Sequence, residues 1–237
     1  MNLTTCSIAA VTAVLVVCPV AWGATKSDLE TASLAFEQSA LRLGDSDERP
    51  SRPIKWTTPI FYVATNAAGS PTLERLAWAA AQRIAAIAGV PIEEVPNGDS
   101  RANFFVILTE NEAPAAPGQA GAQTCYARQW WKGWKLTKVE LYMNFKNFSR
   151  IDRCAIHEVL HNFGFMSHPH GADSILSYVF NRRDLTALDK QLIETLYDPR
   201  MTPGLPRADA AKLGCRILGG KIGASAPDIE ALCQNRR

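Results

Sequence analysis

The side chains best suited to chemistry are the histidines, because all four lie between positions 157 and 170. His157, Glu158 and His161 form the pattern HExxH. Histidines four positions apart project from one face of a helix, so both imidazoles can ligate one zinc ion. Zinc lowers the pKa of a coordinated water toward neutrality, and Glu158 lies close enough to take its proton as the water attacks a carbonyl. The pattern predicts zinc-dependent hydrolysis of a peptide or amide bond, with Glu158 as general base.

A catalytic zinc site needs a third protein ligand and one position left for water. Gly164 can end the helix in the left-handed conformation and turn the chain back under the metal. His168 then returns toward the first two histidines, and we predict that it is the third ligand. The alternatives that stay open are two loop residues and two distant acids that are more typical of a solvated helix face: His170, Asp173, Asp189 and Glu194.

From its first histidine to Gly164, this run resembles the metzincin zinc peptidases, whose motif is HExxHxxGxxH or HExxHxxGxxD. The resemblance breaks at the third ligand, where the matching residue is Ser167 and His168 comes one position later. Metzincins continue with a turn that carries Met below the metal, and residues 173–178 resemble it with Leu176 in place of Met. Tyr178 stands where some metzincins have a tyrosine that binds the metal or stabilises the oxyanion.

The metzincin resemblance implies an α+β, zincin-like fold with a small mixed sheet, an active-site helix and a mostly helical C-terminal part. It also implies a peptide or protein substrate, which would pair with a sheet edge formed by residues 138–145. A second resemblance is to a family of exported bacterial proteins known only as a domain of unknown function. It rests on segments on both sides of the motif: residues 102–104, Cys154, residues 185–190, 196–200 and 203–204.

Four segments are expected along the 237 residues: a signal peptide at 1–23, a polar segment at 24–52, a zincin-like catalytic domain at 53–200 and a helical extension at 201–237. The first segment carries no charged residue, and its apolar stretch precedes Ala21-Trp22-Gly23, which is typical of a secretory signal peptide. This predicts a periplasmic or secreted bacterial protein without a stable membrane span.

Four cysteines remain after removal of the signal peptide, and an even number in an exported chain favours disulfides. The pairing that keeps both loops local is Cys125–Cys154 with Cys215–Cys233, and two other pairings stay open. The net charge of +2 gives no electrostatic case for binding nucleic acid, and we expect a monomer.

The hydrophobic periodicity within the chain predicts a sheet and several helices. The expected strands are Ile54–Thr65, Ala102–Leu108, Tyr126–Trp131 and Trp134–Phe145, with a loop at 112–123. The expected helices are Pro71–Gly89, Ser149–Phe163, Thr186–Tyr197 and two short ones near Asp209–Leu213 and Ala226–Leu232.

The sequence therefore favours an exported zinc metallopeptidase in which Glu158 is the base and Tyr178 assists the oxyanion. The expected zinc ligands are His157, His161 and His168. The alternative is a non-catalytic envelope binding protein with a structural or vestigial zinc site. The two functions differ in the fourth position of the metal, which is open in a catalytic site and closed in a structural one.

Overall fold

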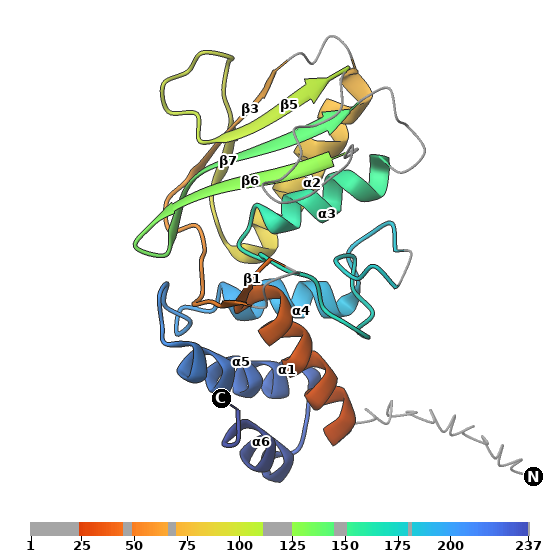
Figure 1. Cartoon of the computed structure of the whole chain (residues 1–237), viewed down its shortest axis with the longest axis vertical. Coiled ribbons are helices and arrows are strands. Elements are labelled where there is room, and N and C mark those ends of the chain that lie inside the picture. Colours follow the sequence, from red (N-terminus) through yellow and green to blue (C-terminus); the bar gives the residue numbers. More distant parts are fainter. Residues whose placement is uncertain are drawn as a thin grey trace, which may run out of the picture.

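The computed structural model describes residues 24–44, 49–65, 70–110, 125–144, 151–179 and 182–236. The predicted signal peptide, the 112–123 loop and the start of the motif helix at Ser149 lie outside these residues. The described elements form two lobes, one built on a sheet and one made of helices (Figure 1). Their mixture of a five-stranded sheet with separate helices confirms the predicted α+β class.

The sheet lobe contains five strands in the order β4 (Ile92–Glu94), β3 (Ile60–Thr65), β5 (Phe104–Thr109), β7 (Lys135–Asn144) and β6 (Cys125–Lys132). Strands β4, β3, β5 and β7 are parallel to one another, and β6 is antiparallel to β7. The expectation that residues 138–145 form the sheet edge is therefore wrong. A tight turn at Gly133 and Trp134, both with positive φ, folds β6 along the free side of β7, so β6 becomes the edge strand.

Two predicted elements have other bounds than expected. The first predicted strand starts at Ile60 instead of Ile54, and before it Lys55 forms only an isolated bridge with Lys135. Residues 54 and 56 are nevertheless buried in the core. Helix α5 spans Arg207–Ile222 and is much longer than the short helix expected near Asp209–Leu213. Its buried face continues beyond that short run through Gly214, Ile217 and Leu218.

Helices α2 (Pro71–Ala88) and α3 (Ile151–His161) pack against each other and against the sheet (Figure 1). Pro71 suits the first turn of α2, and Gly89 ends that helix in the left-handed conformation with φ of 66°. Helix α3 carries the HExxH residues and contacts the edge strand β6. The motif helix therefore lies directly beside the open edge of the sheet.

The helical lobe consists of α1 (Lys26–Ala40), α4 (Ala187–Leu196), α5 and α6 (Ala226–Cys233), with a small antiparallel pair of β1 (Arg42–Leu43) and β2 (Arg49–Pro50) after α1. The predicted polar segment, residues 24–52, contains the packed helix α1, in a stretch whose composition is compatible with a helix. Leu29 and Phe36 of α1 are fully buried, and Phe36 packs directly against Gly214 of α5. The N-terminal helix and the C-terminal helices thus share one core.

The two disulfides have the predicted local pairing, Cys125–Cys154 and Cys215–Cys233. The first joins the start of the edge strand β6 to α3, and the second joins α5 to α6. Such bonds are typical of proteins in an oxidising compartment. Among the described residues, no helix is both long enough and apolar enough to cross a membrane.

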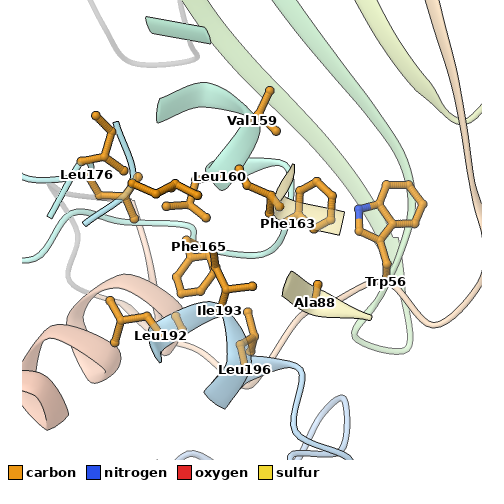
Figure 2. Close-up of a cluster of buried hydrophobic side chains, with 14 of the residues drawn as sticks. Trp56, Ala88, Val159, Leu160, Phe163, Phe165, Leu176, Leu192, Ile193 and Leu196 are labelled. Carbon is orange, nitrogen blue, oxygen red and sulfur yellow. The ribbon is translucent and has the colours of Figure 1, made fainter. Parts of the chain in front are cut away.

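The apolar core between the lobes joins the motif helix to α4. Figure 2 shows Val159 and Leu160 from the end of α3, and Phe163 just after it, together with Leu192 and Leu196 of α4. All five of these side chains are at most 1% exposed. Burial of each large apolar side chain contributes roughly 1.5–3 kcal/mol. This cluster therefore holds the end of the motif helix against α4.

Candidate metal site

Three imidazoles converge on one point at the boundary between the lobes. His157 and His161 come from α3, and His168 comes from the segment that follows it. Their Nε2 atoms lie 2.9 Å (157 to 168), 3.1 Å (161 to 168) and 3.2 Å (157 to 161) apart. Nitrogens about 2.0–2.1 Å from a tetrahedral zinc would lie about 3.3 Å apart, so this triangle has nearly the size that a zinc ion requires. The group could hold a metal ion.

The hydrogen bonds of the two helix histidines set their tautomers. Nδ1 of His157 lies 2.9 Å from the carbonyl oxygen of Ile175, and Nδ1 of His161 contacts the carbonyl oxygen of Phe165. A carbonyl oxygen only accepts, so each Nδ1 carries the proton and each Nε2 keeps its lone pair for a metal. Burial and the two neighbouring imidazoles hold the pKa of His157 well below its usual value, which keeps that ring neutral.

Gly164 makes the return of the chain possible. Its φ is +102°, in the region that side-chain-bearing residues rarely adopt, and a Cβ there would lie 1.9 Å from the carbonyl oxygen of Ile54. Its N–H donates to the carbonyl of His161 at 3.0 Å, directly after α3 ends. The chain then turns so that Phe165 can accept from His161 and His168 can reach the other two rings.

The turn at residues 173–178 contacts His157 of the site. The N–H of Ser177 donates to the carbonyl of Ser174 at 3.1 Å, which closes a tight turn, and Ile175 presents its carbonyl to His157. Leu176 is fully buried in the apolar cluster with Leu160 (Figure 2). Its role as the residue that replaces Met beneath the metal stays a prediction.

Asp189 holds this turn, and the expectation that it belongs to a solvated helix face is wrong. Its side chain is fully buried and accepts hydrogen bonds from Ser174 Oγ at 2.5 Å and from the N–H of Ile175 at 3.0 Å. Asp189 also forms a capping box with Thr186 at the start of α4. Thr-x-x-Asp is a helix-start signal in the sequence, and it could have placed Asp189 at a helix end instead of on a face. The other distant acid, Glu194, is exposed and pairs with Lys221 at 2.7 Å.

Glu158 and Tyr178 both lie near the histidine triangle. Glu158 is half-buried, and its carboxylate accepts a hydrogen bond from the backbone N–H of Ala127 in the edge strand β6. Burial raises the pKa of Glu158 above its usual value. Tyr178 is 65% exposed, and its ring stacks on His168 with the ring centres 4.1 Å apart.

The other sequence candidates are not part of the triangle. Ser167, at the metzincin ligand position, donates its N–H to the carbonyl of Ser39 instead. The His170 side chain is exposed, and Asp173 pairs with Arg182 at 2.5 Å. Among the candidates for the third ligand, only His168 lies with the two helix histidines.

No family model matches the chain, and no curated protein matches it. Among solved structures, the chain is similar to the crystal structure of myroilysin, with a TM-score of 0.40 and 14% sequence identity. The match covers 70% of this chain and 95% of that chain. Membership of the metzincins, or of the exported family of unknown function, therefore stays a prediction.

Proposed function

We infer that this protein is an exported zinc metallopeptidase with His157, His161 and His168 as the metal ligands. The observation that carries the inference is the convergence of three buried Nε2 atoms, two of which belong to imidazoles whose tautomer leaves the lone pair free. Neutral imidazole nitrogens suit zinc, which takes them in tetrahedral geometry. Zinc bound here would polarise a substrate carbonyl and acidify a water molecule.

Glu158 is the proposed proton carrier. It follows the first ligand on α3, and its position beside Ala127 places the carboxylate between the metal ligands and the edge strand. Glu158 would take a proton from the attacking water and pass it to the leaving nitrogen. Tyr178, stacked on His168 at the exposed rim, is proposed to donate to the oxyanion.

We propose a peptide or protein as the substrate. The edge strand is β6, instead of the expected residues 138–145. An extended peptide can form backbone hydrogen bonds with such an edge. Cleavage would then occur where this edge passes the histidine triangle, because Ala127 of β6 already contacts Glu158.

The alternative is a binding protein with a structural zinc ion. Structural zinc sites have four protein ligands, whereas the cluster among the described residues has three protein donors. We propose the catalytic function because zinc held by these three histidines would leave its fourth position to water.

Elemental analysis of protein purified under zinc-replete conditions tests the metal. We expect about one zinc per chain, lost in the His157→Ala/His161→Ala double variant. Glu158→Gln should keep zinc and lower hydrolysis of a peptide library by about 10²–10⁴-fold, because it removes the base and no ligand. Glu194→Gln makes the same change at an exposed acid on α4 and should keep both zinc and activity. Absence of zinc, or full activity of Glu158→Gln, would refute the proposed function, and zinc without hydrolysis would favour the binding protein.

A further inference from the structure

The end of helix α1 and Gly44, which follows strand β1, hold the segment that carries His168. The N–H of Ser167 donates to the carbonyl of Ser39 at 3.2 Å, and Ser167 Oγ donates to the carbonyl of Gly44 at 3.3 Å. The N–H of Gly44 in turn donates to the carbonyl of Met166 at 3.2 Å. Three hydrogen bonds therefore fix the backbone just before the third histidine.

Gln38 fixes the backbone on the other side of that histidine. Its side chain points from α1 into the core and is only 8% exposed. Its Oε1 accepts a hydrogen bond from the N–H of His170 at 2.9 Å. Contacts of α1 at positions 167 and 170 thus bracket His168, and Gly44, which follows strand β1, adds a contact at position 166.

Helix α1 is itself anchored in the helical lobe, away from α3. Phe36 packs on Gly214 of α5, and Glu37 pairs with Arg236 near the C-terminal end at 3.0 Å. His157 and His161 belong to the sheet lobe, since they lie on α3. The distance from these two rings to His168 therefore depends on how α1 holds the 166–170 segment between the lobes.

We propose that α1 is a positioning element of the metal site, with Gln38 as the residue that sets the place of the third ligand. The proposal rests on the proposed function, because it takes the three histidines as zinc ligands. Gln38 acts through the backbone of residues 166–170 and does not touch the metal or the substrate. By linkage, zinc bound to the three histidines must also stabilise the contact between α1 and this segment.

The test compares variants of Gln38 by zinc affinity, measured by competition with a chelator in the full exported chain. Gln38→Met has a similar length but no acceptor, and we expect it to bind zinc at least tenfold more weakly. Gln38→Glu keeps an oxygen for the N–H of His170 and should stay within threefold of the natural protein. Gln82→Met makes the same change at an exposed position of α2 and should have no effect.

Hydrogen exchange separates positioning from a general loss of stability. Zinc should slow exchange of the Ser167 and His170 amides in the natural protein, and much less in Gln38→Met, at a temperature where both metal-free proteins are folded. If Gln38→Met does not fold, Gln38→Asn replaces it, because its amide is one methylene too short to reach His170.

The outcomes distinguish this proposal from the proposed function. Normal zinc affinity and normal zinc-dependent protection in Gln38→Met would refute the positioning role and leave the peptidase proposal intact. Weak zinc binding in Gln38→Met together with no hydrolysis by the natural protein would support the positioning role and refute the peptidase. A natural protein that binds no zinc would contradict both.

Discussion

Removing the carboxylate of Asp189 should loosen the turn beneath the metal site. This side chain accepts four hydrogen bonds: 2.5 Å from Ser174 Oγ, 3.0 Å from the N–H of Ile175, and 2.8 and 2.9 Å from the N–H and hydroxyl of Thr186. A hydrogen bond to a charged group contributes about 1.5–3 kcal/mol, and the two from the buried turn have no water to replace the acceptor. We therefore expect Asp189→Ala to lower the free energy of unfolding by about 4 kcal/mol.

Asp189→Asn is the informative comparison. An amide oxygen in the place of Oδ2 can still accept from Ile175 and Thr186, and the amide N–H₂ can donate to Ser174 Oγ. Burial raises the pKa of Asp189, which means that the buried charge itself has an unfavourable desolvation cost that the neutral amide avoids. The expected loss is about 1 kcal/mol.

Urea unfolding of the metal-free protein at pH 7 measures both changes, with Glu194→Ala on the exposed face of the same helix as control. That control should stay within about 0.5 kcal/mol of the natural protein. Asp189→Ala should also weaken zinc binding about 10–100-fold, since the turn presents the Ile175 carbonyl to His157. Equal stability of Asp189→Ala and Asp189→Asn would refute the role of the carboxylate in holding the turn.

Two further predictions concern stability. Burial lowers the pKa of Lys55, whose Nζ donates to the carbonyls of Leu196 and Asp198, from 10.5 to about 8. The unfolded chain then binds more protons than the folded one between these values, so the free energy of unfolding should rise by about 1.5 kcal/mol from pH 8 to 9.5. Urea titrations should find this rise absent in Lys55→Met, and a rise of the same size in that variant would contradict the assignment. Gly164→Ala should cost about 4 kcal/mol through its positive φ and its overlap with Ile54, and Gly98→Ala, with φ of +91° and open space, about 1–2 kcal/mol. Thermal or urea unfolding checks this difference, and equal costs would mean that the contact with Ile54 relaxes freely.

Features with a local signal were predictable from the sequence. The helical spacing of His157 and His161 and the glycine stop at Gly164 depend on a few neighbouring residues, and the structure contains both. The short loops between cysteines favoured the observed disulfide pairing, because short loops close most easily. The strands predicted at Tyr126–Trp131 and Trp134–Phe145 are present as β6 and β7, which pair with each other.

Features that depend on contacts between distant segments were not predictable. Strand order is one example: β6 and not β7 is the edge, because a hairpin can fold to either side of its partner strand and periodicity does not choose the side. The buried role of Asp189 is another, since a polar residue at a helix start can face solvent or the core, and the 173–178 turn decides which.

The sequence alone determined the chemistry of the site: two histidines one turn apart, a carboxylate beside them and a glycine that reverses the chain. These follow from backbone geometry within a few residues. Only the tertiary structure decided which of the later side chains joins them. His168 reaches the triangle because α1, more than a hundred residues earlier in the chain, binds the backbone on both sides of it, and no local pattern contains that contact.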